Sequence, residues 1–202
     1  MRFVFLDPGP LVDNELTLVA PEVKWVDEML AACTHPSTLR EAPPPGQRDN
    51  PMTRAKLMEF VTNAPMGHQT ADPAAGRVPA YHFWFRLDDP VGDPPIQMIG
   101  GLGLRIGTNR ELELYSGNIG YHVYPPARGH HYAERACRLI LPLARRHGMS
   151  RIWITCNPDN IPSRRTCERL GAQLVDTVPI PKDHPFRSRG EVAKCRYLIE
   201  LP

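Results

Sequence analysis

The strongest chemical signal lies in residues 120–136. This stretch reads as a strand, a turn with two prolines, a loop that contains Gly129, and the start of an amphipathic helix. A glycine-bearing loop that opens into a helix directs several backbone N–H groups at one point, beside the positive end of the helix dipole. This geometry is typical of a site for phosphate or pyrophosphate.

A second block follows in residues 151–171. It reads as the strand Arg151–Cys156, a turn rich in Asn and Pro, and a short basic helix that ends at Gly171. Asn160 and Ser163 lie where the turn enters this helix, so an amide and a hydroxyl sit beside a helix N-terminus. The order and spacing of the two blocks make the combination more informative than either block alone.

Together the two blocks resemble the GNAT superfamily of acyl-CoA-dependent N-acyltransferases, and in particular its ribosomal-protein N-terminal acetyltransferase branch. The pyrophosphate signature of that family is Arg/Gln-x-x-Gly-x-Gly/Ala, and its fixed positions are occupied by Arg128, His131 and Ala133. The downstream signature, Asn-x-x-Ser/Ala before a helix and a terminal Gly, matches Asn160, Ser163 and Gly171. The similarity is clear over residues 96–178 of a chain that we expect to form one domain, 1–202.

The resemblance implies acetyl-CoA as co-substrate. In the family, the strand before the loop separates from its neighbour and exposes N–H groups that bind the pantetheine arm. That strand would be Ile119–Tyr124, with Val123 as a donor, and the opening would lie between it and Arg151–Cys156. The cofactor-binding residues implied in this way are Tyr121, Val123, Arg128, Gly129, His130, His131, Tyr132, Ala133 and Asn160.

Simpler interpretations of the same residues stay open. The loop could be an ordinary strand-to-helix turn, and Asn160 could be a helix N-cap. His131 replaces the usual glycine of the family, whose missing Cβ lets the backbone approach a phosphate closely. This replacement bears on the affinity for the cofactor more than on its identity.

Amide formation from a thioester needs a neutral amine, a donor for the carbonyl oxygen and an acid for the departing thiolate. In the resembled branch, a serine at the start of the second helix is the proposed partner of the sulfur, and Ser163 matches it. N-capping is an equally good interpretation of Ser163. Cys167 holds the position where many relatives carry a tyrosine acid, and we expect it to be a small buried helix residue.

The general base is less clear from the sequence. Relatives often carry a glutamate where this chain has Asn118, which cannot accept a proton. His122 shares its strand parity with Asn118 and Gly120, and an imidazole with a pKa of about 6.5 could accept a proton directly or through water. Glu111 and Glu113 are weaker candidates, and an amine that arrives deprotonated needs no base.

Composition excludes several classes. The chain has 24 basic and 22 acidic residues, and its arginine-bearing helices lack interleaved aromatics, so we expect no nucleic-acid partner. No apolar run approaches the length of a membrane span. The five cysteines contain no C-x-x-C pair, which favours reduced thiols and a cytoplasmic location. Adjacent His130 and His131 would point to different sides of a helix, so we expect no metal site.

The elements that must position these residues predict an α/β fold of GNAT type. We expect a mixed, mostly antiparallel, twisted sheet of about seven strands with about four helices on its two faces. The predicted strands are 15–19, 81–87, 96–106, 113–123, 151–156, 173–178 and 193–199. The predicted helices are 21–33, 51–62, 131–147 with a bend at Pro142, and 162–170. Segment 38–50 is predicted to be a loop, and 63–79 is predicted to be either a long mobile loop or a short element without a clear pattern.

The function expected from the resemblance is transfer of an acetyl group to a primary amine by direct attack in a ternary complex. The acceptor would enter between 38–79 and 179–191, and it could be a protein N-terminus, a polyamine-like molecule or an aminoglycoside. A homodimer is left open. The alternative is a catalytically idle acyl-CoA-binding sensor of the same fold.

Overall fold

The computed structural model describes residues 3–41, 51–64, 67–72 and 76–201. Its larger sheet has the strand order β1-β2-β4-β5-β6, with β3 paired to β4, and its smaller sheet has the order β7-β9-β8. The strands of the larger sheet are β1 (Val12–Asp13), β2 (Leu16–Val19), β3 (His68–Gln69), β4 (Ala80–Val91), β5 (Ile96–Arg105) and β6 (Ile119–Val123). Those of the smaller sheet are β7 (Arg151–Cys156), β8 (Gln173–Pro179) and β9 (Ala193–Glu200).

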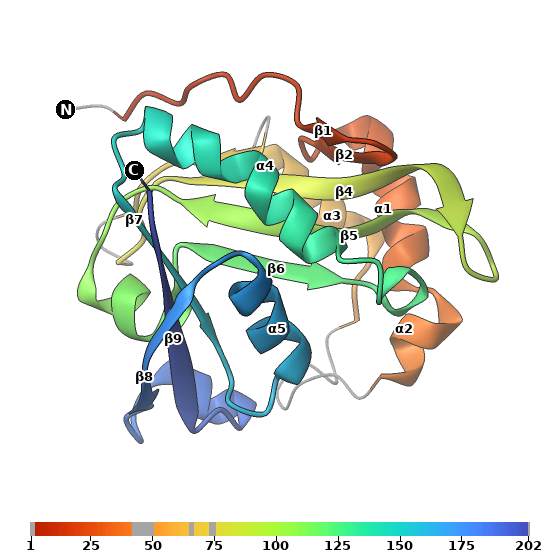
Figure 1. The fold of residues 1–202 in the computed structure, drawn as a ribbon. Helices are drawn as coiled ribbons and strands as arrows, with labels where there is room; N and C mark the ends of the chain where they lie inside the picture. Colours follow the sequence, from red (N-terminus) through yellow and green to blue (C-terminus); the bar gives the residue numbers. More distant parts are fainter. Residues whose placement is uncertain (1–2, 42–50, 65–66, 73–75, 202) are drawn as a thin grey trace.

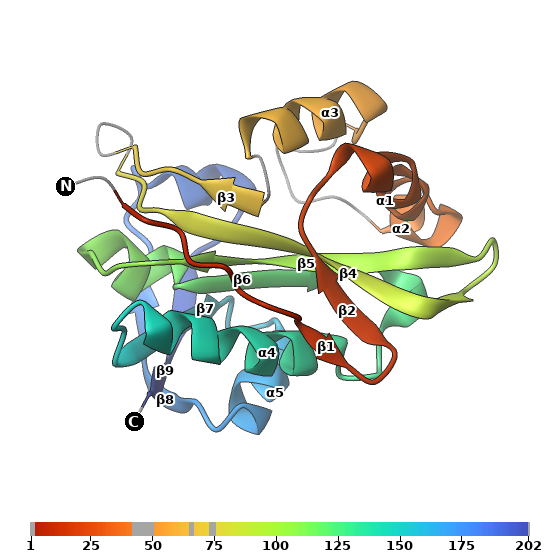
Figure 2. The same cartoon turned by 90° about the horizontal axis from the view of Figure 1, so that it is seen from above.

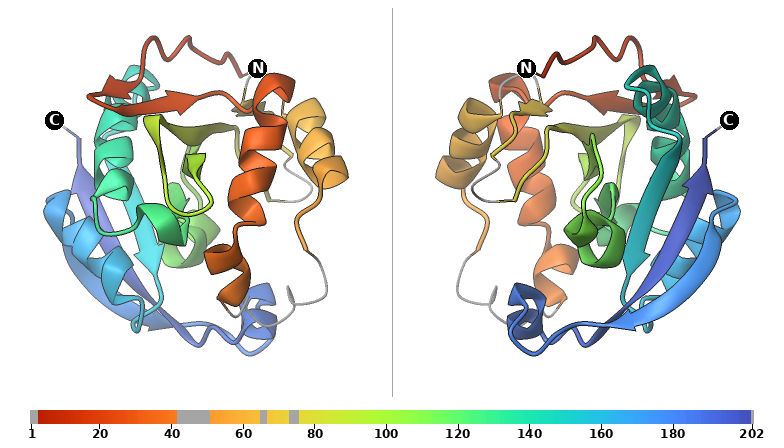
Figure 3. Two further views of the ribbon diagram at one scale, coloured as in Figure 1. Left: turned by 90° about the vertical axis from the view of Figure 1, so that its right-hand side faces the viewer. Right: turned by 90° about the vertical axis from the view of Figure 1, so that its left-hand side faces the viewer.

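Helices cover both sides of the sheets, as predicted. On one side lie α1 (Val26–Cys33), α2 (Pro36–Arg40) and α3 (Arg54–Asn63), and on the other lie α4 (Tyr132–Arg146) and α5 (Ile161–Arg169) (Figure 3). The predicted α/β class is therefore confirmed. Since β1 and β3 have only two residues each, the longer strands of the described chain match the expected number.

The predicted amphipathic helix of the first block is α4, and it runs through Pro142 without interruption. Its apolar stripe packs on the sheet, with Ala136, Cys137, Ile140, Leu143 and Ala144 all buried. Burying an aliphatic side chain of the size of Ile140 or Leu143 contributes about 1.5–3 kcal/mol. This packing fixes the N-terminus of α4, and with it the predicted anion site, beside the end of β6.

The prediction of a strand from residue 113 was wrong at its start. Residues Leu112–Ser116 form a helical turn, and β6 begins only at Ile119. The Asn109 side chain accepts the Leu112 N–H at 2.9 Å, which stabilises the turn, and Gly117 ends it with a φ of 66°. The alternating apolar residues predict a strand here, but the Asn109 cap favours a helical turn instead.

The predicted loop 38–50 and segment 63–79 both contain short elements. Thr38–Arg40 belongs to α2, because Pro36 can begin a helix and the His35 ring accepts the Ser37 N–H at 3.1 Å. Residues 42–50 of the same predicted loop lie outside the described residues. Segment 63–79 contributes β3 to the edge of β4. No helix in the described ranges is long and apolar enough to cross a membrane.

The hairpin of β1 and β2 lies beside α4 (Figure 2), and one arginine of α4 fixes it there. Arg135 donates to Asp13 Oδ2 at 2.6 Å and to Glu15 Oε1 at 2.7 Å. The pKa of Glu15 is lowered from 4.5 to about 2, and the hydrogen bond from Arg135 is the largest cause. The ion pair therefore stabilises the fold only while Glu15 is charged.

We expect this contribution to be complete above pH 4.5 and to disappear as the pH falls toward 2, because the unfolded chain then takes up the proton first. Urea denaturation at several pH values should show a weaker acid dependence for Glu15→Gln than for the wild type. Glu59→Gln, at an exposed site on α3, is the control. Identical pH dependence in Glu15→Gln and the wild type would contradict the assignment.

Candidate active site

The candidate site is built where β6 and β7 separate. The Asn118 N–H donates to Trp153 O at 2.6 Å, and its Oδ1 accepts the Trp153 N–H at 2.9 Å. Its side-chain nitrogen donates to Arg105 O and Gly107 O. Beyond this buried residue the two strands belong to different sheets and diverge (Figure 1). Asn118 thus has a positioning role, and its amide is fully used.

Strand β6 turns alternate N–H groups toward this opening. The Tyr124 N–H donates to Ile99 O, which marks one of the residues whose backbone bonds to β5. Bonded and non-bonded pairs alternate along an antiparallel ladder. The N–H groups of Tyr121 and Val123 therefore point away from β5 and into the opening, where the family resemblance requires donors.

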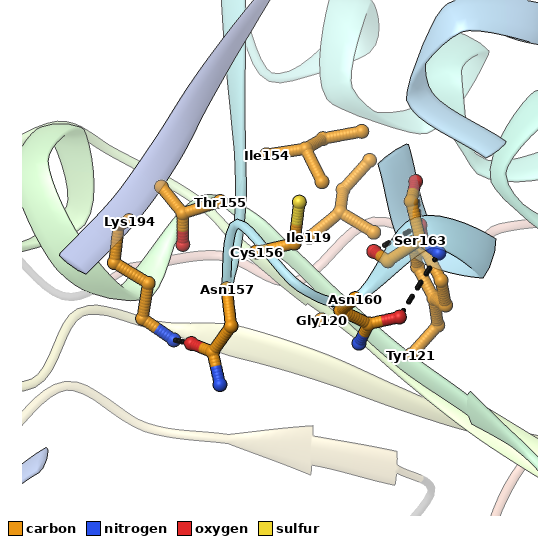
Figure 4. A pocket seen from close by; sticks show the side chains of 10 residues that line it. All are labelled: Ile119, Gly120, Tyr121, Ile154, Thr155, Cys156, Asn157, Asn160, Ser163 and Lys194. Carbon is orange, nitrogen blue, oxygen red and sulfur yellow. Dashed lines mark hydrogen bonds between the residues drawn. The ribbon is translucent and has the colours of Figure 1, made fainter. Parts of the chain in front are cut away.

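The opening contains a cavity of about 170 Å³ (Figure 4). It is lined by Ile119, Gly120, Tyr121, Ile154, Thr155, Cys156, Asn157, Asn160, Ser163 and Lys194. Both blocks found in the sequence therefore contribute to one cavity. The sequence did not single out Thr155, Asn157 and Lys194. They lie near the ends of strands, and only the fold shows that these strand ends come together.

A hydroxyl pair lies at one wall of this cavity. Ser163 Oγ is 2.9 Å from the Tyr121 hydroxyl, and the Ser163 N–H donates to Asn160 Oδ1 at 3.1 Å. Asn160 is therefore the N-cap of α5, as the simpler interpretation held, and it also faces the cavity. This cap fixes the first turn of α5 and aims Ser163 at Tyr121 (Figure 4).

The hydroxyl pair keeps its protons. Burial raises the pKa of Tyr121 far above its usual value, and the nearby Cys167 raises it further. The phenol therefore stays neutral at any working pH and can donate a hydrogen bond. Sequence reasoning proposed Tyr121 only for its backbone, because the contact with Ser163 joins residues far apart in the chain.

Cys167 is fully buried, as expected, and contacts Cys156 at the cavity. The Cys167 thiol lowers the pKa of Cys156, while the pKa of Cys167 rises. Cys167 therefore keeps its proton and supports Cys156. Its place behind the cavity wall explains why it cannot replace the tyrosine of relatives as a direct proton donor.

The predicted phosphate loop offers a row of main-chain donors. No backbone or side-chain acceptor in the described part of the chain receives the N–H groups of residues 129–134. The ring of Tyr132 is 7% exposed and His130 is exposed, so Tyr132 can offer only its main chain to an anion. Ala133, in the first turn of α4, adds no bulky side chain. A set of main-chain donors at a helix N-terminus that have no acceptor within the described chain fits a diphosphate.

Two residues of this loop depart from a simple anion site. His131 has a φ of 60°, the left-handed conformation that favours glycine, which explains why the resembled signature has Gly at this position. Arg128 donates from Nε to Val123 O at 2.9 Å and pairs with Glu41 through its other nitrogens. Arg128 therefore braces the loop against β6 and α2.

A second cavity, of about 230 Å³, lies on the opposite face of β6. It is lined by Phe60, His82, Phe83, Trp84, Gly101, Leu102, Gly103, Gly120, Tyr121 and His122. Gly120 and Tyr121 line both cavities. The predicted parity of Gly120 and His122 is thus confirmed, and His122 faces the second cavity rather than Ser163.

His122 is open to solvent through this cavity, yet the protein atoms around its ring lower its pKa, and the charge of Arg128 lowers it further. The lowered pKa keeps the ring neutral at physiological pH and makes it a weak base, suited to accepting a hydrogen bond or the proton of a strongly acidic N–H group. Burial and Arg105 lower the pKa of His82 to about 4. Glu111 and Glu113 accept hydrogen bonds from Ser116 and Thr108, and neither lines one of these two cavities.

Sequence comparison identifies the family. Residues 15–173 match the model of the acetyltransferase (GNAT) domain. The chain belongs to the GNAT acetyltransferases. A search of curated proteins gave no match. Among the described residues of this GNAT chain, no group of His, Cys, Asp or Glu side chains could hold a metal ion.

Solved structures agree on the fold of this GNAT acetyltransferase. The microcin C7 self-immunity acetyltransferase MccE, in complex with acetyl-CoA and AMP, is 16% identical, with 94% of each chain covered and a TM-score of 0.66. RimL, the ribosomal L7/L12 alpha-N-protein acetyltransferase, in complex with coenzyme A, is 15% identical over 94% of this chain and 96% of its own, with a TM-score of 0.63. A GNAT acetyltransferase from Bacillus anthracis is 19% identical, with coverages of 95% and 98% and a TM-score of 0.62.

We expect Ser163→Ala and Tyr121→Phe each to lower kcat by about 100-fold, because each breaks the hydroxyl pair that would donate a hydrogen bond to the departing sulfur. The double variant should be little worse than the single ones, since the two groups act as a unit. Thiol release from acetyl-CoA measures kcat, and calorimetry should show near wild-type affinity for coenzyme A. Ser188→Ala, at an exposed hydroxyl outside the cavity, is the control; additive losses would contradict the pairing.

We expect His131→Gly to raise the free energy of unfolding by up to about 1 kcal/mol, since an L-residue at positive φ is strained. The same change should tighten coenzyme A binding by letting the loop approach the phosphates. Gly129→Ala is the matched opposite change: its φ is 90° and the added methyl meets no atom, so only backbone strain opposes it. Thermal melts and calorimetry on both variants check the signs, and a shift of both in one direction would overturn this account.

Proposed function

We propose that this chain transfers an acetyl group from acetyl-CoA to a primary amine by direct attack in a ternary complex. The observation that carries the proposal is the meeting of two cavities at Gly120 and Tyr121. One cavity lies in the opening between β6 and β7, and the other lies on the opposite face of β6. Gly120 has no side chain, so a thioester from the first side and an amine from the second can reach each other there.

The main chain would hold acetyl-CoA. The free N–H groups of residues 129–134 supply donors to the diphosphate, and those of Tyr121 and Val123 face the pantetheine arm. This arrangement directs the thioester along β6 toward Ser163. Holding the two reactants together lowers the entropic barrier to the bimolecular step.

In the reaction the amine nitrogen bonds to the carbonyl carbon and the carbon–sulfur bond breaks. The departing thiolate accepts a hydrogen bond from the Ser163–Tyr121 pair, whose oxygens are 2.9 Å apart, and takes its proton from solvent. The nitrogen loses a proton, which becomes acidic once the new bond forms. Neutral His122, on the amine side, can accept it directly or through water.

One related structure supports a kind of acceptor. RimL is named for acetylation of a protein N-terminus, which suits a primary amine as acceptor. MccE is described in complex with acetyl-CoA and AMP, so the same fold can hold a nucleotide together with the cofactor. The alternative of an idle acyl-CoA sensor predicts binding of acetyl-CoA without transfer to any amine.

The test is thiol release from acetyl-CoA with a panel of amines, coupled to mass spectrometry of the acetylated product. We expect turnover that depends on the amine and falls in Ser163→Ala and His122→Ala. Tight acetyl-CoA binding with no product from any amine would favour the sensor. Absence of acetyl-CoA binding would overturn the proposal.

The meeting point of the cavities has its own test. A Cβ at Gly120 would lie 3.7 Å from its nearest neighbour, Arg105 Nη1, so Gly120→Ala should fold normally. We expect this variant to bind acetyl-CoA but to lose at least about tenfold in kcat, because the methyl group separates the reactants. Gly148→Ala, at a site with free space outside both cavities, controls for a glycine change. Unchanged kcat in Gly120→Ala would show that the transfer step does not take place beside Gly120.

A further inference from the structure

The second cavity is a narrow slot whose floor has almost no side chains. Two cross-strand rows form it, His82–Gly103–Gly120 and Trp84–Gly101–His122. An added Cβ would lie 3.4 Å from His122 at Gly101 and 3.2 Å from His82 at Gly103. The glycines therefore keep the floor flat, and larger residues would fill the space. We call this cavity the aromatic slot.

Aromatic rings form the walls of the aromatic slot. Phe60 of α3 stacks on Trp84, with ring centroids 6.3 Å apart, and meets His82 edge-on at 5.5 Å. No aspartate or glutamate lines it. Flat rings over a glycine floor provide stacking and edge contacts, which suit an aromatic or similarly flat group. The volume, about 230 Å³, is below the range of about 300–1,000 Å³ for drug-sized ligands.

A guanidinium lies at one end of the aromatic slot. Arg105 Nη1 is 3.7 Å from the Cβ position of Gly120. Arg105 donates to two carbonyl oxygens, Ser116 O and Gly117 O, and forms no ion pair with a carboxylate of the described residues. Glu111 acts on it only through space. A partly buried arginine with carbonyl partners alone retains capacity for an anion.

The lowered pKa values of the two histidines are consistent with a positive electrostatic potential in the aromatic slot. Arg105 lowers the pKa of His82, and Arg128 lowers that of His122, in each case after the larger effect of the surrounding protein. The same field opposes a cationic ligand. A polyamine or an aminoglycoside, with several ammonium groups, would meet no carboxylate on the lining residues, and it would lie near the guanidinium of Arg105, which has no carboxylate partner among the described residues.

Resting on the proposed acetyl transfer, we propose that the acceptor is an amine that carries a flat aromatic group and a nearby anionic group, with the ring in the aromatic slot and the anion on Arg105. The positive field serves the chemistry as well. It lowers the pKa of a bound ammonium ion and so favours the neutral amine that attacks the thioester.

Steady-state transfer to four matched amines tests the class. Phenylalanine has ring and carboxylate, phenylalaninamide has the ring alone, alanine has the carboxylate alone, and spermidine has neither. We expect kcat/KM to be highest for phenylalanine and about tenfold lower for phenylalaninamide, the size of one charge-assisted hydrogen bond. Spermidine should give no more than background rates.

Substitutions test which residue causes each of these substrate preferences. Arg105→Gln should abolish the preference for phenylalanine over phenylalaninamide, and Arg105→Lys should retain part of it. Trp84→Leu should reduce the preference for phenylalanine over alanine and leave the carboxylate preference intact. Arg110→Gln, at an exposed arginine on the following turn, is the control for charge alone. Circular dichroism melts establish that each variant is folded.

A binding measurement separates this proposal from the proposed function. Calorimetry with 3-phenylpropionate, which has no amine, should detect binding that is weakened about tenfold in Arg105→Gln and unaffected in Ser163→Ala. Transfer to other amines, with no binding of 3-phenylpropionate, would overturn the acceptor class and leave acetyl transfer standing. Binding of 3-phenylpropionate without transfer to any amine would leave the slot standing and overturn the proposed reaction.

Discussion

The structure of the site depends on the separation of β6 from β7, which begins just beyond Asn118. Backbone groups of a strand seek partners, so two neighbouring strands close into a ladder unless something holds them apart. Asn118 joins the strands at one end with main-chain and side-chain bonds to Trp153. Beyond it, the packing of α4 and α5 carries β7 into the smaller sheet. The N–H groups of β6 are left for a ligand.

A second consequence of this arrangement is that the two faces of β6 line different cavities. Its odd-numbered side chains meet α4 and α5, where Tyr121 contacts Ser163, while its even-numbered positions face α3. A strand with a bulky residue at position 120 would separate the two sides. Gly120 leaves them in contact, so the chain can bind two reactants on different faces and still bring them together.

Charge and burial divide the chemical roles. The acid side is built from neutral hydroxyls whose protons are retained by burial, as at Tyr121. The amine side is built from neutral histidines under the influence of two arginines. Hydrogen-bond donors on one side serve the departing sulfur, and uncharged acceptors on the other serve the attacking amine.

The sequence by itself determined the family and the order of elements and predicted a main-chain anion site, because these follow from local patterns: glycine and proline positions, strand parity and the periodicity of α4. It failed at 112–116, where a side-chain cap outweighed an alternating pattern. Only the tertiary structure decided that Tyr121 pairs with Ser163, that Asn118 braces two sheets, and that Phe60 and Arg105 border one slot. These contacts join residues distant in the chain, and their geometry depends on how the helices pack on a divided sheet.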